Sequence, residues 1–213
     1  MTYSIKEIFY TLQGEGTHAG RPAVFCRFSG CNLWSGNERD RATAICRFCD
    51  TDFVGVDGTN GGKYLSAVLL ADAIGNCWPV EDRSRKKPMV VFTGGEPLLQ
   101  LDSTLVDEMQ DRGFEVAIET NGTKLPPPGI DWICVSPKVG APLLLDHGDE
   151  LKLVYPQEQC DPSVFSALNF QHFYLQPMDG PCQEENVRRA AAYCLANPQW
   201  ELSLQIHKLV GLR

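Results

Sequence analysis

The sequence has no hydrophobic run that approaches the roughly 20 residues a helix needs to cross a bilayer. Residues 1–7 also lack the apolar core of a signal peptide. Basic residues are in deficit, with 19 lysines and arginines against 27 acidic side chains, which argues against a long phosphate-neutralising surface. We therefore expect a cytoplasmic protein that binds neither a membrane nor nucleic acid.

Internal repeats, low-complexity tracts and flexible interdomain linkers are also absent from the sequence. Its 213 residues are 43% hydrophobic and 22% charged, which is ordinary for a folded protein and sufficient for one core. We therefore expect a single domain over residues 1–213.

Short apolar runs alternate with segments of helical spacing. The expected buried strands are residues 5–12, 23–28, 89–93, 114–120, 132–136, 151–155, 173–176 and 202–206. The expected helices are residues 66–77, 98–112 and 181–196, and Gly113 follows the second of them as a stop signal. This alternation predicts an α/β fold with mainly parallel strands, in which functional loops follow the carboxyl ends of the strands.

Residues 30–62 interrupt the alternation and are rich in Gly, Asn, Asp, Arg and Cys, which indicates an ordered functional loop. The loop holds Cys31, Cys46 and Cys49, separated by fourteen and then two residues. Cysteines of a cytosolic chain are more readily metal ligands or reactive thiols than disulfides. On the cysteines alone, the loop could bind an iron–sulfur cluster, bind zinc with Cys26 or His18 as a fourth ligand, or bind no metal.

A second motif is the turn Gly94-Gly95-Glu96-Pro97, which follows the apolar run 89–93. Glycines at the end of a strand allow a ligand to approach the backbone closely. A plain strand-to-helix turn, with Pro97 beginning the helix, would use the same residues. The turn alone therefore leaves its role open.

The three-cysteine loop followed by a strand and Gly-Gly-Glu-Pro resembles the radical S-adenosylmethionine enzymes. That family most often has three residues between its first two cysteines, whereas this sequence has fourteen. The long spacing resembles the 7-carboxy-7-deazaguanine synthase family in particular, as do the motifs at residues 9–16, 46–51, 136–138 and 175–180. The resemblance runs from near residue 5 to the carboxyl terminus and is thinner over residues 142–173. It implies an incomplete β/α barrel and a homodimer.

By this resemblance, Cys31, Cys46 and Cys49 bind a [4Fe–4S] cluster, which leaves one iron free for S-adenosylmethionine. The residues that the resemblance places around S-adenosylmethionine are Phe48, Asp50, Gly95, Glu96, Ser136, Lys138 and Gln176. Other interpretations of single residues remain open, since Phe48 would also suit a core and Lys138 an exposed charge.

The implied substrate is 6-carboxy-5,6,7,8-tetrahydropterin. Its expected contacts are Leu12, Gln13, Gly14, Glu15, Arg27, Thr93, His207 and Arg213. Arg27 lies in a buried-strand run, where its guanidinium suits the substrate carboxylate or an ion pair with an acid such as Asp50. The segment around Gly14 would also suit a polar surface turn.

Thr51 directly follows Cys49-Asp50. By the resemblance, its oxygen binds a Mg²⁺ ion that also meets the substrate carboxylate, and Mg²⁺ prefers oxygen ligands. A cap or turn role for Thr51 is the alternative.

The implied reaction begins with abstraction of the C6 hydrogen by a 5′-deoxyadenosyl radical. The ring contracts, the hydrogen returns to regenerate S-adenosylmethionine, and loss of ammonia gives 7-carboxy-7-deazaguanine, a precursor of queuosine and other 7-deazapurines. A one-electron donor such as flavodoxin or ferredoxin is also implied. The alternatives are a glycyl-radical-type activating enzyme and a zinc-stabilised binding module without catalysis. The other six cysteines are expected to be mostly small buried hydrophobic residues.

Overall fold

The computed structural model describes residues 2–79 and 87–212. In chain order, and with η marking a 3-10 helix, its elements are β1 (Tyr3–Leu12), β2 (Pro22–Phe28), η1 (Glu38–Thr43), β3 (Gly62–Tyr64), α1 (Ala67–Cys77), β4 (Met89–Gly94), η2 (Pro97–Leu99), α2 (Ser103–Asp111), β5 (Glu115–Thr120), β6 (Trp132–Val135), β7 (His147–Tyr155), η3 (Pro162–Phe165), β8 (Asn169–Pro177), α3 (Gln183–Ala196), β9 (Glu201–Leu202) and α4 (Ile206–Leu209). None of the helices in these ranges has the length and apolar composition of a membrane span.

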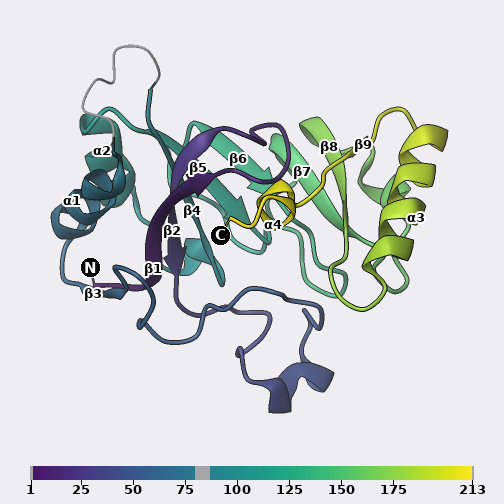
Figure 1. Ribbon diagram of the computed structural model, residues 1–213, viewed down its shortest axis with the longest axis horizontal. Coiled ribbons are helices and arrows are strands. Elements are labelled where there is room, and N and C mark those ends of the chain that lie inside the picture. The colour runs from purple at the N-terminus through teal and green to yellow at the C-terminus, as the bar shows by residue number, and fades with distance from the viewer. Residues whose placement is uncertain (1, 80–86, 213) are drawn as a thin grey trace.

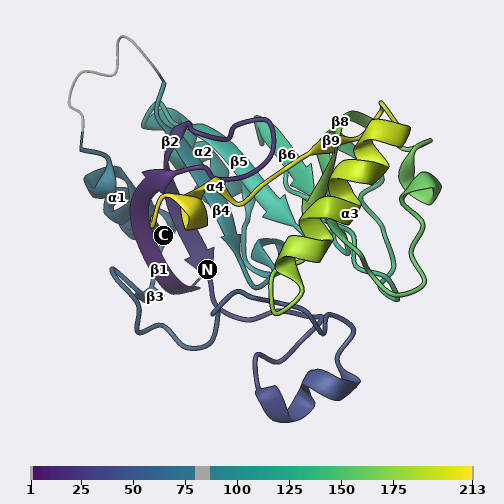
Figure 2. The same ribbon diagram turned by 45° about the vertical axis from the view of Figure 1, so that its right-hand side comes forward.

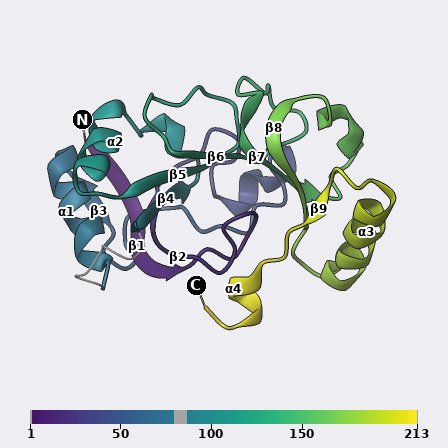
Figure 3. The same cartoon turned by 90° about the horizontal axis from the view of Figure 1, so that it is seen from above.

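The strands form one sheet in the order β3-β1-β2-β4-β5-β6-β7-β8-β9. β1 pairs antiparallel with β2 and β3, whereas the pairings from β2 to β9 are parallel. The carboxyl ends from β2 onward therefore lie along one edge. The sheet curves without closing on itself (Figure 3), which confirms the expected incomplete β/α barrel with mainly parallel strands.

Helices cover the convex face of the sheet at its two ends (Figure 1). α1 and α2 pack their apolar sides on the strands at one end, where Leu70, Leu105 and Phe92 share a fully buried cluster. α3 packs on β8 at the other end, where Ala190 and Leu175 belong to a second cluster. Each fully buried large apolar side chain contributes about 1.5–3 kcal/mol to folding. Packing on the sheet therefore stabilises these helices more than helix propensity does.

The concave face carries only a small apolar cluster, formed by Ala23, Met89, Val91 and Ala117. Side chains alternate between the two faces of a strand, so each buried strand sends one set into the convex core and the other set inward. Nearer the carboxyl edge, the inward set is polar. The open barrel thus encloses a polar interior in place of a closed apolar core.

β7 and β8 each begin four residues earlier than expected, η1 and η3 were not predicted, and three further differences stand out. The helix expected over 98–112 splits into η2 and α2, because Asp102 adopts an extended backbone and its side chain caps α2 by accepting from the Leu105 N–H at 3.0 Å. The strand expected over 202–206 ends at Leu202, and Ile206 begins α4. β3 was not predicted, because three residues are too few to show an alternating pattern.

Residues 30–62 form the excursion between β2 and β3 that the sequence indicates, and η1 projects from its outer end (Figure 2). Lys6 of β1 anchors this loop, because its ammonium group lies 2.9 Å from Asp52 and 2.8 Å from Asp57 and donates to the Val54 carbonyl. The guanidinium of Arg41 stacks 3.9 Å from the Trp34 ring. These contacts fix a segment that has little secondary structure of its own.

Candidate active site

A cavity of about 370 Å³ opens on the concave side, where the strand ends meet the 30–62 loop and the last turn of the chain. It brings together seventeen of the predicted site residues: Leu12, Gln13, Gly14, Glu15, Arg27, Cys31, Cys46, Phe48, Cys49, Asp50, Thr51, Thr93, Gly95, Ser136, Lys138, Gln176 and His207. Glu96 does not line the cavity, and Arg213 lies outside the described residues.

The three cysteines of the 30–62 loop occupy one side of the cavity. The backbone N–H of Leu33 points at the Cys31 sulfur at 3.4 Å, and a hydrogen bond from Cys46 lowers the pKa of Cys49 to about 6. Both contacts favour thiolate, the form of cysteine that binds metal. Burial opposes this at Cys31 by raising its pKa, and the hydrogen bond to Cys49 together with burial raises the pKa of Cys46. Three thiols on one cavity wall are a suitable donor set for an iron–sulfur cluster that keeps one iron free.

The residues named as a fourth zinc ligand lie elsewhere. Cys26 is fully buried in the core beneath α1, and the His18 ring packs on Trp132 with 4.3 Å between ring centroids. Neither residue lines the cavity that holds the three cysteines. The zinc alternative therefore loses both of its proposed ligands.

Gly95 stands where the backbone of the Gly-Gly-Glu turn meets the cysteine loop. A Cβ atom at Gly95 would lie 1.9 Å from the Gly30 carbonyl oxygen, so only glycine fits without moving Cys31. The turn is held by the Gly95 N–H donating to Phe28 and the Glu96 N–H donating to Gly30. The turn therefore packs directly on the cysteine loop, and Gly95, which lines the cavity, adds no side chain between the cysteines and a ligand beside them.

The Glu96 carboxylate is fully buried and does not line the cavity. Burial raises its pKa, while three donors stabilise its charged form: Thr120 Oγ1 at 2.7 Å, Asn121 N at 2.8 Å and Leu98 N at 3.0 Å. The carboxylate thus joins the end of β4 to the end of β5. Any contact between Glu96 and a cofactor would use the backbone.

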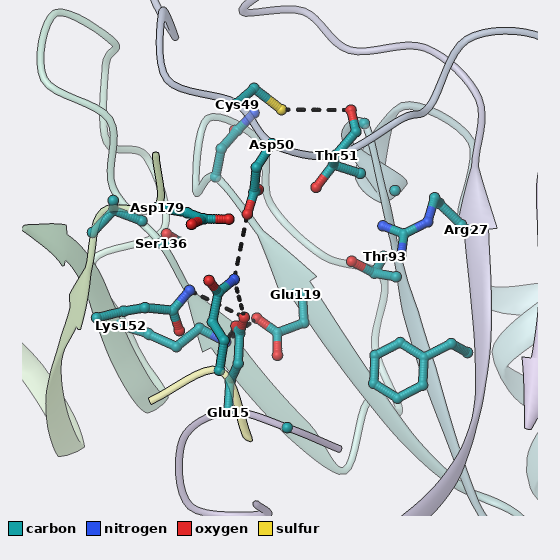
Figure 4. A pocket seen from close by; sticks show the side chains of 18 of the residues that line it. Glu15, Arg27, Cys49, Asp50, Thr51, Thr93, Glu119, Ser136, Lys152 and Asp179 are labelled. Atoms are coloured by element: carbon teal, nitrogen blue, oxygen red, sulfur yellow. Dashed lines mark hydrogen bonds and ion pairs between the residues drawn. The ribbon is translucent and has the colours of Figure 1, made fainter. Parts of the chain in front are cut away.

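Arg27 points its guanidinium into the cavity beside Thr93 and Thr51 (Figure 4). Its Nε donates to Oε1 of Glu7 at 3.0 Å, and its Cζ lies 5.9 Å from the centroid of the Phe9 ring. The sequence left open an ion pair with an acid such as Asp50, but the partner is Glu7. Because the pair uses Nε, it leaves the two terminal nitrogens of this cavity-lining residue available to a ligand.

Opposite Arg27 lies an acid–amide array, which we define as Gln13, Glu15, Glu119, Lys152, Gln176 and Gln205 (Figure 4). Lys152 Nζ lies 2.8 Å from Glu15 and 2.7 Å from Glu119. Gln13 donates to Glu119 at 3.1 Å, while Gln176 and Gln205 donate to Glu15 at 3.1 and 3.0 Å.

Charge and burial in this array produce an acceptor surface. Burial would raise the pKa of Glu15, but Lys152 lowers it to about 2, so the group is ionised at neutral pH. The Oε1 atom of Gln176 is buried and has no hydrogen-bond partner among the described residues. Buried polar atoms are normally paired, so a donor on a bound ligand is the natural partner for this oxygen.

Ser136 and Lys138 follow β6 at the carboxyl edge, as the sequence indicates. Lys138 Nζ donates to both the carbonyl and the hydroxyl oxygen of Ser136, at 2.6 and 2.7 Å. Burial lowers the pKa of Lys138, and both residues line the cavity. The interpretation of Lys138 as an exposed surface charge is therefore wrong.

Helix α4 lies in front of the central strands (Figure 2), and its residues His207 and Lys208 line the cavity. The Ile206 N–H donates to the Gly14 carbonyl at 2.9 Å, and His207 packs so closely that a Cβ at Gly14 would lie 2.0 Å from its Nδ1. Lys208 donates to Asp50 at 2.8 Å and also to Asp179. The last turn is therefore tied to both sides of the opening.

Sixteen residues that line the cavity were not predicted as site residues, and they include six charged or amide-bearing residues discussed above: Glu7, Glu119, Lys152, Asp179, Gln205 and Lys208. Charged residues inside apolar strand runs were the available signal for Glu7, Glu119 and Lys152. The expectation of buried cysteines also needs correction. Cys26 and Cys134 are buried, but Cys182 is exposed in the turn before α3, and Cys77, Cys160 and Cys194 are half-buried.

The chain is similar to known proteins in both sequence and structure. No protein-family model matches the chain. It is 61% identical over 212 residues to the 7-carboxy-7-deazaguanine synthase of Bordetella pertussis, with 100% of both chains covered. The enzyme of the same name from Caulobacter vibrioides is 60% identical over 212 residues, again with 100% of both chains covered. The crystal structure of QueE from Escherichia coli matches with a TM-score of 0.72 and 27% identity, covering 97% of this chain and 95% of that one. The chain belongs to the 7-carboxy-7-deazaguanine synthase family.

Proposed function

We propose that this protein is a radical S-adenosylmethionine lyase that converts 6-carboxy-5,6,7,8-tetrahydropterin to 7-carboxy-7-deazaguanine with loss of ammonia, for queuosine and other 7-deazapurines. One observation carries the proposal. A single cavity has three cysteine thiols on one wall and, on the others, a guanidinium and an array of buried carboxylates and amides. A radical generated at the first wall would therefore form beside a substrate held by the others.

The family implies a [4Fe–4S] cluster and S-adenosylmethionine. Cys31, Cys46 and Cys49 would bind the cluster, and the bare backbone at Gly95 would receive the methionyl group. The residues placed to bind the rest of S-adenosylmethionine are Phe48, Asp50, Glu96 through its backbone, Ser136, Lys138 and Gln176. When bound and reduced, this pair of cofactors supplies a 5′-deoxyadenosyl radical.

The substrate would lie between Arg27 and the acid–amide array. Arg27 offers its two terminal nitrogens to the substrate carboxylate, a bidentate arrangement that suits a planar anion. Thr51 and Thr93 lie beside this guanidinium, and Thr51 would supply an oxygen to a Mg²⁺ ion that shares the carboxylate (Figure 4). Arg213, the remaining predicted contact, lies outside the described residues and stays a prediction.

The heterocycle carries an amino group and ring N–H groups, which require acceptors. Glu15 and Glu119 supply such acceptors, and the peptides at Leu12 and Gly14 add backbone groups. His207 covers Gly14 from α4, so this end of the cavity is closed toward solvent. The chain thereby orients C6 of the substrate and excludes water, which protects a radical reaction.

We also infer an electron donor of the flavodoxin or ferredoxin type. The cysteine loop reaches the surface, because Ile45 and Arg47 on either side of Cys46 are exposed. A homodimer stays a prediction from the resemblance, and a cytoplasmic location stays a prediction from the sequence.

An anaerobic turnover assay tests the proposal. Reconstituted protein is incubated with S-adenosylmethionine, a one-electron reductant, Mg²⁺ and 6-carboxytetrahydropterin, and the product is identified by mass spectrometry. We expect 7-carboxy-7-deazaguanine from the unaltered protein and from Cys182→Ala, whose cysteine is exposed outside the cavity, and none from Cys31→Ala. A brown protein inert toward the pterin would favour a glycyl-radical activating enzyme, and a colourless zinc protein would favour the binding module.

A further inference from the structure

Lys152 is a buried cation that joins two distant parts of the chain beneath the cavity. It lies on β7 with its side chain 4% exposed. Its ammonium group bonds at once to Glu15, in the turn after β1, and to Glu119, near the end of β5. The two carboxylates come from distant parts of the sequence, and the shared contact with Lys152 holds them at a fixed separation.

The groups around Lys152 are mostly acidic. Besides Glu15 and Glu119, they include Glu150 on β7, which is 2% exposed, and Cys134 on β6, whose sulfur lies 3.4 Å from Glu150. Glu150 also accepts from the Thr17 N–H at 3.0 Å. The basic groups that face this cluster are His207 on α4, Lys138 beyond β6 and His18, which lines a small cavity together with Glu15, Glu119 and Glu150.

Loss of Lys152 would leave buried carboxylates without a close cation. A buried carboxylate in that state takes up a proton, because its charged form is no longer compensated. A protonated carboxyl group donates one hydrogen bond in place of accepting it. The same cavity would then offer donors where a substrate rich in N–H groups needs acceptors.

We propose that Lys152 is a positioning residue that keeps Glu15 and Glu119 ionised and spaced as paired acceptors for the N–H edge of the heterocyclic substrate. This inference rests on the proposed function and adds to it the residue that fixes its recognition surface. One cation holds two acceptors, so the array carries one net negative charge and selects ligands that present several N–H donors.

The electrostatics support this role. Burial disfavours the charge on Lys152, yet Cys134, Glu119, Glu15 and Glu150 raise its pKa well above the ordinary value. Burial raises the pKa of Glu119 even in the presence of Lys152. Glu119 is therefore the first group to take up a proton when the cation is removed, followed by Glu15.

Steady-state kinetics of Lys152→Met, Lys152→Arg and the exposed-site control Lys63→Met test the inference. We expect Lys152→Met to raise KM for the pterin by about tenfold with a smaller change in kcat, and to move the acidic limb of kcat/KM toward neutral pH. Lys152→Arg keeps the positive charge, so the acidic limb of its kcat/KM profile should lie at the same pH as in the unaltered enzyme. Lys63→Met, on the exposed edge strand β3, should match the unaltered enzyme.

Iron content and S-adenosylmethionine binding distinguish an effect on pterin recognition from a general loss of the folded site. Both should be unchanged in Lys152→Met. Unchanged KM and an unmoved pH profile in a folded Lys152→Met protein would overturn the inference. If Lys152→Met does not fold, the double variant Lys152→Met/Glu119→Gln is compared with Glu119→Gln. We expect the higher pterin KM in the double variant, and equal values would contradict the role. An unaltered enzyme that does not turn over the pterin would instead refute the proposed function.

Discussion

Glu7 and Arg27 stand directly opposite each other on the antiparallel strands β1 and β2, and their ion pair at 3.0 Å uses Nε of the guanidinium. The pair therefore orients Arg27 without occupying its terminal nitrogens. Both side chains are mostly shielded from solvent, with exposures of 20% for Arg27 and 14% for Glu7. A guanidinium held in this way is preorganised for a carboxylate.

Arg27→Ala should raise KM for the pterin by roughly 10- to 100-fold, because it removes charge-assisted hydrogen bonds to the substrate carboxylate. Equilibrium binding of tetrahydropterin without the carboxylate is the matched control, and the variant should not weaken it. Glu7→Gln should give a smaller effect of the same kind. An equal loss of affinity for the pterins with and without the carboxylate would show that Arg27 supports the cavity and does not bind the carboxylate.

Gly95→Ala should abolish binding of S-adenosylmethionine and lower the iron content, because the added Cβ would collide with the Gly30 carbonyl next to Cys31. Gly75→Ala provides the contrast, since nothing lies within 4 Å of its Cβ position and it sits within α1. That change should stabilise the protein by about 0.5–1 kcal/mol. Iron analysis and thermal unfolding measure both effects, and a fully loaded Gly95→Ala protein would contradict the close packing.

Glu96→Gln should lower the thermal midpoint, with a cost of about 2–3 kcal/mol, because an amide nitrogen would replace an acceptor that faces buried donors. Thr120→Val, which removes one of these donors, should have a similar but smaller effect. The primary effect should be a loss of stability. Cofactor affinity should fall as a consequence, because the junction between β4 and β5 loosens. An unchanged midpoint together with weak cofactor binding would place the Glu96 carboxylate on the cofactor.

Lys208→Met should raise KM for the pterin about threefold to fivefold, because it unties α4 from Asp50 and Asp179. The contribution of Asp179 is present above its ordinary pKa and is lost only as pH falls through a value that Lys208 lowers further. Burial opposes the charge on Lys208, but its two carboxylate partners raise its pKa, so its contribution persists until the pH rises through that higher value.

The ratio of KM values between Lys208→Met and the unaltered enzyme should therefore be constant between about pH 5 and about pH 9. Kinetics at several pH values in that window check this. A ratio that changes with pH inside the window would mean that another titrating group controls α4.

The sequence was informative where polar residues directly follow apolar strand runs. Ser136 and Gln176 lie at or just beyond the carboxyl ends of β6 and β8, which a parallel sheet gathers at one edge. Gln13 follows β1, which runs antiparallel to β2, so it reaches the same cavity from the other end of the strands. The cysteine spacing and the Gly-Gly-Glu turn added the family resemblance. Together they predicted the fold class and most of the cavity wall.

Other features depend on strand register, which the linear pattern does not contain. Glu119 and Lys152 lie inside apolar runs of β5 and β7. They meet because Glu119 pairs with Cys134 of β6, which pairs with Glu150, two residues before Lys152. Glu7 becomes the partner of Arg27 through the β1–β2 register. The Lys208 tie depends on α4, which lies partly where the sequence pattern indicated a strand.

The most direct test of the central claim is hydrogen transfer within the cavity. The protein is given 6-carboxytetrahydropterin with deuterium at C6, and recovered S-adenosylmethionine is analysed by mass spectrometry. We expect deuterium in S-adenosylmethionine together with formation of 7-carboxy-7-deazaguanine, because one cavity holds both molecules. Turnover that leaves S-adenosylmethionine free of deuterium would contradict the claim that the cysteine wall and the acid–amide array act on a shared substrate.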